Sequence, residues 1–144
     1  MKPSEKDIRK LLGLKDTEKF STLVSHLRYV YASEDKVLKL DRFSSSSELE
    51  KQTIIEAKRY KEIPRGLKKH FPRLIKTGRL RGSLYIIQER IIFKNPRSPH
   101  NRFGEYRKLR DKILKKTTWD LCDTDHNWGV RKDTNEIVIY DFAL

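Results

Sequence analysis

Acidic and amide side chains gather in a short stretch near the end of the sequence. Asp120, Asp123, Asp125 and Asn127 fall within eight positions, and Asp141 follows after an apolar run. Asn and Asp side chains offered together from loops are typical hard-oxygen ligands for Mg²⁺. The stretch therefore predicts Mg²⁺ binding. Solvated turn residues beside a hairpin are the alternative interpretation.

The apolar residues around this stretch predict a hairpin that would position two of these side chains. Val130 and residues 137–140 are the predicted strands, and the polar residues 131–135 form the turn between them. Such a hairpin places Asn127 just before one strand and Asp141 just after the other. Their side chains could then converge on one Mg²⁺ ion.

Hydrophobic periodicity and turn residues predict an α+β order for the rest of the chain. At 144 residues, the length is that of one domain. Ser4 and Gly13 are placed to begin and end the first helix, and Ser47 with Glu50 has the spacing of a capping box. The predicted elements are, in order, helix 4–13, strands 19–24, 27–32 and 36–40, helix 49–60, strands 71–77 and 83–92, helix 102–116 and the terminal hairpin.

Lys39 lies in the middle of the third predicted strand, which is an unusual place for a lysine. Leu38 and Leu40 point to the opposite face of this strand, while Val37 shares the face of Lys39. The next predicted helix contains an acidic residue, Glu56. An ordinary surface ion pair between the two would contribute little to stability, so its meaning depends on the other motifs.

Taken in this order and at these separations, the motifs resemble those of the protein-kinase fold. Lys39 precedes Glu56 by 17 residues and Glu89 by 50, and Asn127 precedes Asp141 by 14. Residues 37–39 are similar to the V-A-I-K motif, residues 87–90 to the hinge, and residues 141–143 to D-F-G, with alanine in place of glycine. The resemblance covers roughly residues 19–144 and is strongest to the minimal kinase-like proteins of phages and other microbial sources.

The resemblance implies a compact two-lobed fold that forms one structural domain overall. Residues 1–94 would be the N-lobe-like part, with an antiparallel sheet of five strands and one main helix. Residues 95–144 would be a reduced C-lobe-like part that contains the catalytic-loop-like segment and the terminal Asp-Phe.

The resemblance also implies a role for each motif in binding ATP and Mg²⁺. Lys39 would pair with Glu56 and hold the α- and β-phosphates of ATP. Asn127 and Asp141 would hold Mg²⁺. The residues that would present backbone groups to adenine are Gln88, Glu89 and Arg90.

The segment that aligns with the glycine-rich loop of kinases contains no glycine. Leu23, Ser25 and Arg28 occupy the three glycine positions. Because side chains there limit how closely the backbone approaches phosphates, Ser25, His26 or Arg28 would have to make these contacts instead.

The catalytic base that the resemblance implies is also displaced. The position five residues before Asn127 is occupied by Cys122. Asp123 is the nearest carboxylate and is the preferred base; Asp120, which begins an Asp-Leu pair as in H-R-D-L, is the second choice. Asp125 lies closer still to Asn127.

The charge of the chain restricts its partners. Basic residues number 33 and acidic residues 20, which gives a net charge of +13. Such an excess attracts polyanions, and we expect an acidic protein partner or substrate, with nucleic acid as the alternative. No apolar run approaches the length of a membrane span. With a single cysteine and no signal peptide at the start, we expect a cytoplasmic protein, in the host cytoplasm if a phage encodes it.

Three functions remain open from the sequence. The first is a minimal phosphotransferase that uses ATP and Mg²⁺ to phosphorylate Ser or Thr hydroxyls of proteins. The second is a pseudokinase with the same fold, which acts by docking on a partner. The third is a basic nucleic-acid-binding domain, although the sequence has no helix-turn-helix, zinc or aromatic RNA-binding motif.

Overall fold

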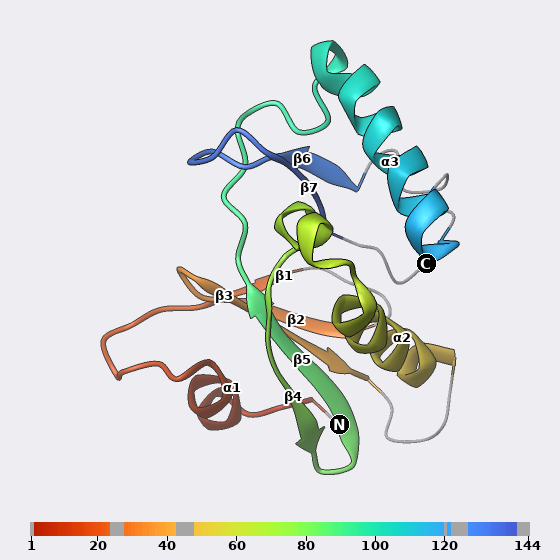
Figure 1. Ribbon diagram of the computed structural model, residues 1–144. Coiled ribbons are helices and arrows are strands. Elements are labelled where there is room, and N and C mark those ends of the chain that lie inside the picture. Colours follow the sequence, from red (N-terminus) through yellow and green to blue (C-terminus); the bar gives the residue numbers. More distant parts are fainter. Residues whose placement is uncertain (1, 24–27, 43–47, 120, 122–126, 141–144) are drawn as a thin grey trace. The chain divides into compact units, whose positions relative to one another are not determined.

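A computed structural model describes residues 2–23, 28–42, 48–119, 121 and 127–140 (Figure 1). Its contacts divide the chain into two compact units, and each unit is built from two stretches of the chain. The first unit comprises Met1–Lys58 and Leu74–Arg90, and the second comprises Arg59–Arg73 and Ile91–Leu144. The segment 59–73, which the sequence placed in the N-terminal part, thus belongs with the C-terminal residues.

A five-stranded antiparallel sheet is the centre of the first unit, which confirms the α+β class. Its strand order is β1-β2-β3-β5-β4, so that β5 lies between β3 and β4. The strands are β1 (Ser21–Leu23), β2 (Arg28–Ala32), β3 (Lys36–Asp41), β4 (Leu74–Leu80) and β5 (Ser83–Glu89).

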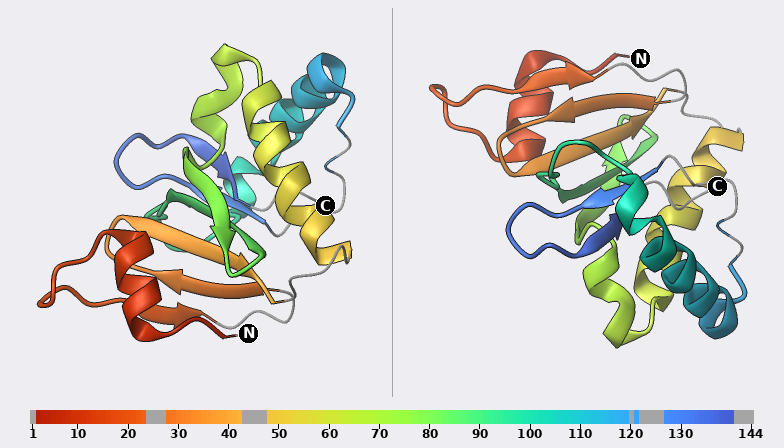
Figure 2. Two further views of the ribbon diagram at one scale, coloured as in Figure 1. Left: turned by 90° about the horizontal axis from the view of Figure 1, so that it is seen from below. Right: turned by 90° about the horizontal axis from the view of Figure 1, so that it is seen from above.

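Helix α1 (Glu5–Leu12) covers the apolar face of this sheet (Figure 2). The expected cap is present: the Ser4 hydroxyl accepts from the Asp7 backbone N–H, and the Asp7 carboxylate accepts from the Ser4 N–H. Gly13 ends the helix in the left-handed conformation, with φ of 67°. Ile8 and Leu12 of α1 pack in one cluster with buried sheet residues that include Tyr31, Leu38, Leu40, Tyr85 and Ile87.

The opposite face of the sheet carries polar and charged side chains as well as apolar ones. Since side chains alternate along a strand, Lys39 and Asp41 of β3 point away from the face that holds Leu38 and Leu40. Helix α2 (Glu48–Glu62) supplies their partners, Thr53 and Glu56, both of which are buried. This polar layer is the part of the fold that positions the candidate site.

The β4–β5 hairpin corrects the predicted boundaries. Strand β4 ends at Leu80, where the sequence predicted an end at Thr77 and a turn from Gly78. The turn is only Arg81-Gly82, both with positive φ, as a two-residue hairpin loop requires. Gly78 is a strand residue opposite Tyr85, and its missing side chain leaves space for the tyrosine ring. Strand β5 ends at Glu89, three residues before the predicted end at Ile92.

The second unit packs helices against a small hairpin. Helix α3 (Phe103–Thr117) follows a short 3-10 turn, η2 (His100–Arg102), and confirms the predicted helix within one residue. Strands β6 (Trp128–Val130) and β7 (Ile137–Ile139) pair antiparallel, as the predicted hairpin requires. Trp128 is fully buried, and its ring stacks on Tyr106 of α3 with centroids 4.8 Å apart.

A further 3-10 helix, η1 (Arg65–His70), was not predicted. Helix α2 ends at Glu62, just before Pro64, and η1 follows in residues for which the sequence predicted no element. Leu67 and Phe71 are buried in the core of the second unit, which explains why β4 begins only at Leu74. None of the helices formed by the described residues combines the length and the apolar character needed to cross a membrane.

Candidate functional site

Lys39 occupies the position that its sequence context predicted. It lies on β3 between Val30 of β2 and Ile86 of β5 as cross-strand neighbours. Strands on both sides hold the backbone of β3, and the alternation along the strand directs the Lys39 side chain to the face that α2 covers. The position is therefore fixed by the middle of the sheet.

Glu56 of α2 is the direct partner of Lys39. The Lys39 Nζ atom lies 2.9 Å from Oε1 of Glu56. The side chain of Glu56 is only 3% exposed and that of Lys39 11%. The interpretation of an ordinary surface pair does not apply to such burial, because a surface pair is defined by its access to water.

Arg28 of β2 is a second cation on the same carboxylate. Its Nη1 atom donates to Oε2 of Glu56 at 2.8 Å, so each carboxylate oxygen has its own positive partner. The sequence analysis placed Arg28 in the predicted strand 27–32 and aligned it with the glycine-rich loop as a possible phosphate contact, and it missed the contact with Glu56. The available signal was parity: Arg28 and Val30 share a face of β2, and Val30 opposes Lys39.

A further buried hydrogen bond joins α2 to the sheet beside this cluster. The Thr53 hydroxyl donates to Oδ1 of Asp41, and both residues are buried. Asp41 lies opposite Arg28 in the register of β2 and β3. Among the described residues, Lys39, Arg28, Glu56 and Asp41 thus bring two cations and two carboxylates to this cluster, and their charges balance.

The two cations determine the protonation of Glu56. Burial by itself raises the pKa of this carboxyl, but the charges of Lys39 and Arg28 and their hydrogen bonds outweigh burial. The net result is a Glu56 pKa below its ordinary value. The carboxylate is therefore ionised at neutral pH and holds both cations in place.

In chemical terms, the cluster fixes an ammonium group beside an ionised carboxylate. A lysine held in this way loses little conformational freedom when it contacts an anion, which favours binding of phosphate oxygens. The same cluster could instead serve only to join α2 to the sheet. The two interpretations differ in whether Lys39 has a ligand.

Gln88, Glu89 and Arg90, the residues predicted to face adenine, lie at the end of β5 and just beyond it. Gln88 and Glu89 pair with Val37 and Lys36 of β3. The backbone N–H of Arg90 donates to the carbonyl of Asp35 at 2.9 Å, and its guanidinium donates to the carbonyl of Ser33 at 2.8 Å. The Arg90 N–H is thus used within the fold, and adenine would have to be met by other backbone groups.

Asn127 belongs to the second unit and lies where the predicted hairpin required it. It directly precedes β6, and its carbonyl accepts a hydrogen bond from the Tyr140 N–H at 3.1 Å. The ladder therefore continues by one pair beyond β6 and β7. Asp141 is the next residue in the chain, and an amide with a carboxylate is a hard-oxygen donor set suited to Mg²⁺.

Several predicted site residues lie outside the part of the chain that the structure describes. They are Ser25, Asp120, Asp123 and Asp141, together with Cys122 and Asp125.

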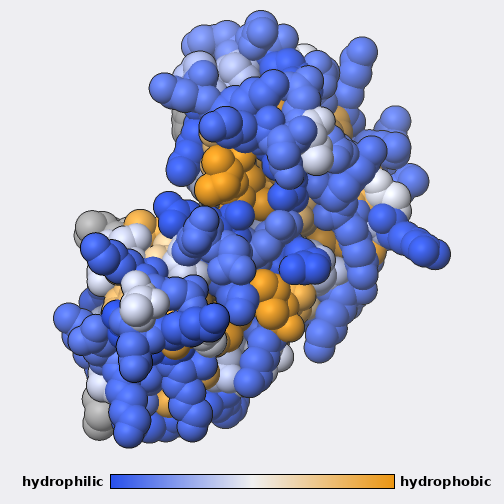
Figure 3. Space-filling model, turned by 90° about the vertical axis from the view of Figure 1, so that its left-hand side faces the viewer, coloured by the Kyte–Doolittle hydropathy of each residue, from blue (hydrophilic) through white to orange (hydrophobic). Residues whose placement is uncertain are grey.

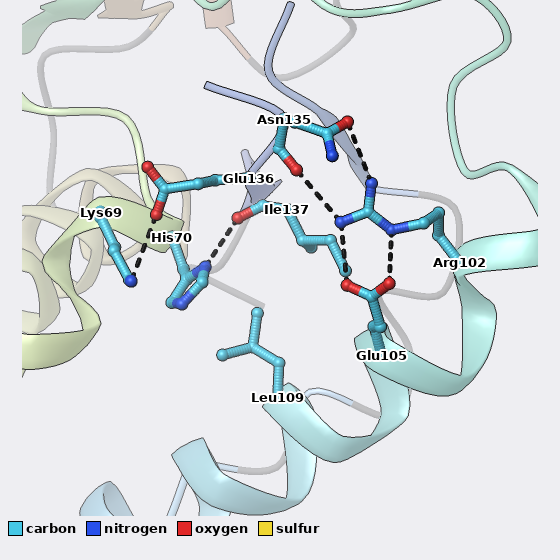
Figure 4. Close-up of a pocket in the computed structure, with 8 residues that line it drawn as sticks. All are labelled: Lys69, His70, Arg102, Glu105, Leu109, Asn135, Glu136 and Ile137. Atoms are coloured by element: carbon cyan, nitrogen blue, oxygen red, sulfur yellow. Dashed lines mark hydrogen bonds and ion pairs between the residues drawn. The ribbon is translucent and has the colours of Figure 1, made fainter. Parts of the chain in front are cut away.

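A surface pocket of about 240 Å³ lies within the second unit (Figure 4). The His70 ring points to the carbonyl of Ile137, with Nδ1 2.8 Å away. The charged side chains that line the pocket form ion pairs with one another. Lys69 lies 3.3 Å from Glu136, and Arg102 lies 2.7 Å from Glu105. Since its charges are paired internally, the pocket is a weaker candidate than the Lys39 cluster.

Comparisons with models of protein families and with curated proteins find no match for the chain.

Proposed function

We propose that the protein is a kinase-like protein with a two-lobed fold, which binds ATP with Mg²⁺ and transfers the γ-phosphate to a protein hydroxyl. Lys39 contacts the phosphates and Glu56 orients it. Asn127 and Asp141 are the residues whose oxygens would hold Mg²⁺, which would supply charge neutralisation at the phosphates. Asp123 is the proposed base, with Asp120 as second choice.

The single observation that carries this proposal is the buried pair of Lys39 with Glu56. In protein kinases the phosphate-binding lysine lies on the third strand and pairs with a glutamate of the following helix. Here the lysine lies on β3, the glutamate lies on the next helix α2, and their charged atoms are 2.9 Å apart. Buried ion pairs are often no more stabilising than apolar side chains of the same size, so a requirement for function is a physical reason to have one.

Thermal unfolding with and without MgATP tests the binding step. A ligand that binds only the folded state stabilises it by about 2.7 kcal/mol at a hundredfold excess over Kd. We expect MgATP to raise the Tm of the wild type but not that of Lys39→Met, and Asp141→Asn to remove the dependence on Mg²⁺. Lys76→Met is a matched control, because Lys76 is exposed on β4 of the same sheet. A wild type whose Tm does not change at millimolar MgATP would contradict the proposal.

Transfer of labelled phosphate to a hydroxyl-rich protein tests the enzymatic step. We expect Asp123→Asn to abolish transfer while MgATP still binds, and Asp120→Asn to have a smaller effect, because a base that orients the acceptor does not touch the nucleotide. MgATP binding without transfer in the wild type would instead favour a pseudokinase that acts by docking. The glycine-free segment and Cys122 are the sequence features that favour this second function.

A further inference from the structure

Glu56 differs from the carboxylate of a simple ion pair because two cations share it. Lys39 reaches Oε1 at 2.9 Å and Arg28 reaches Oε2 at 2.8 Å. The two cations come from different strands, β3 and β2, and their side chains are 11% and 10% exposed. Glu56 is therefore attached to the sheet at two points.

A lysine that contacts phosphate and is the only partner of a buried carboxylate would create a problem. When its ammonium turns to the ligand, the carboxylate loses its counter-charge in a place that water does not reach. An uncompensated buried charge is strongly destabilising, and the group takes up a proton instead. A second cation that stays in place removes this conflict.

We propose that Arg28 is a positioning residue of the Lys39 site: it holds Glu56 ionised and attached to the sheet, so that the ammonium of Lys39 is free to turn toward a ligand phosphate. This inference rests on the proposed function. Arg28 is suited to the task because its guanidinium remains charged at every relevant pH. The lowered pKa of Glu56 is consistent with two cations on one carboxylate.

Among the described residues, the charged side chains on the sheet face that Glu56 meets come from β2, β3 and β4. On this face, β2 contributes Arg28 and β3 contributes Lys39 and Asp41. The β5 residues on the same face, Ile86 and Gln88, do not titrate. Strand β4 contributes Arg79, which is exposed and donates to the Gly82 carbonyl. Asp41 accepts its hydrogen bond from Thr53 and is common to all the variants compared below.

An experiment without ligand tests whether Arg28 alone keeps Glu56 ionised. Urea unfolding is measured between pH 3 and 8 for Lys39→Met, Arg28→Met and the double variant. In each single variant we expect the free energy of unfolding to rise as the pH increases through the titration of Glu56. In the double variant this rise should be lost. Adding Glu56→Gln to the double variant should restore stability, because the buried charge without a partner is then gone.

Two results of this experiment would overturn the proposal. One is a Lys39→Met variant that behaves like the double variant, since Arg28 would then not hold the carboxylate. The other is a triple variant no more stable than the double variant. A double variant that fails to fold while the triple variant folds would support the proposal as clearly as a shifted titration.

A calorimetric titration with MgATP at pH 7 tests the role during binding. Heats are compared in two buffers of different ionisation enthalpy, which reports protons taken up. We expect Arg28→Met to take up more protons than the wild type, because Lys39 then leaves Glu56 without a partner, and Arg28→Lys to behave like the wild type. A purely structural role would weaken binding without proton uptake, and that result would overturn the proposal. A wild type that binds no MgATP would refute the proposed function, while the ligand-free experiment would still decide the role of Arg28.

Discussion

At the scale of residues, the polar face of the sheet shows how charge is kept inside a small protein. Burial alone would raise the pKa of the Glu56 carboxyl and favour its protonated form. The charges of Lys39 and Arg28 lower this pKa instead. Each contact depends on the others, because the loss of the carboxylate would leave Lys39 and Arg28 close together without an anion between them.

We expect the free energy of unfolding to depend on Glu56 in the acid range. The folded-state pKa lies below the ordinary value of 4.5, so the unfolded chain binds the proton first as the pH falls. The stability from Glu56 is therefore complete above about pH 4.5 and is lost as the pH falls through the folded-state pKa. Glu56→Gln should lower stability at pH 7 by roughly 3–5 kcal/mol, as expected when a buried pair is broken, and should flatten the acid limb in urea unfolding.

Glu5→Gln is the matched control for this prediction. Glu5 also pairs with an arginine, Arg9, but its side chain is 70% exposed. We expect a change within about 0.5 kcal/mol, as for most surface substitutions. Equal losses in the two variants would contradict the interpretation that burial decides the effect.

His70 in the second unit should make the free energy of unfolding depend on pH in a range above that of Glu56. Burial lowers its pKa most, the Ile137 carbonyl raises it, and the charge of Lys69 lowers it further, which leaves the pKa below 6.5. The unfolded state therefore binds the proton first, and stability should fall as the pH decreases below about 6.5. His70→Asn should reduce this slope, which urea unfolding between pH 5 and 8 would measure. If the pH dependence of stability were the same in His70→Asn and the wild type, the role assigned to His70 would be wrong.

The sequence was informative about Lys39 and uninformative about Arg28 for a physical reason. A lysine in mid-strand with leucines on both sides defines its face by alternation alone. The partner in the next helix, Glu56, was indicated by the resemblance to the protein-kinase motifs. The contact of Arg28 depends on the register between β2 and β3, and register is set by pairing across the whole sheet and not by local residues.

At the scale of elements, helices and hairpin strands were predicted more accurately than the boundaries between units. Ser4, Gly13 and the apolar spacing of α1 act locally, and that helix agrees with its prediction. The predicted boundary at residue 94 differs from the division by contacts, in which the chain leaves the first unit within α2 and returns at Leu74. The residues of segment 59–73 alone do not determine whether it packs in the core of the first unit or of the second.

The β4–β5 hairpin should not tolerate a side chain at Gly78. A Cβ atom there would come within 2.5 Å of the Tyr85 hydroxyl, and Tyr85 is only 5% exposed. Gly78→Ala should lower the free energy of unfolding by about 1–3 kcal/mol, as overpacking does. Urea unfolding measures this change. Gly104→Ala in α3 is the matched control: no atom lies within 4 Å of its added Cβ, so stability should stay the same or rise by up to about 1 kcal/mol. Similar losses at both positions would contradict the packing argument.

At the scale of the whole molecule, the dominant property is positive charge. Hydrophilic residues cover most of the face that Figure 3 shows. Helix α3 contributes a dense basic group, because Arg107, Lys108, Lys112, Lys115 and Lys116 are all exposed. In α1 Lys6 lies between Glu5 and Asp7, while Lys10 follows Arg9 in the last turn.

We expect polyanions to bind, with an affinity that falls steeply with salt. Lys115→Glu with Lys116→Glu should weaken binding of polyglutamate and of a single-stranded oligonucleotide more than Lys6→Glu with Lys10→Glu, although both pairs change the net charge equally. Fluorescence anisotropy at several salt concentrations measures this. Equal losses would assign the attraction to net charge and not to α3. Preference for one probe at equal charge would distinguish an acidic protein partner from nucleic acid.

The strand order β1-β2-β3-β5-β4 has a consequence for the order in which the protein is synthesised. Strand β3 is complete at residue 41, but its second neighbour, β5, ends only at residue 89. Chains emerge from the ribosome at about 5–20 residues per second, so the edge of β3 waits several seconds for its partner. Because β4 and β5 pair through a two-residue turn, they can form first and then join β3 as a finished hairpin. The nascent sheet of β1, β2 and β3 would thus grow by adding one preformed hairpin at the free edge of β3.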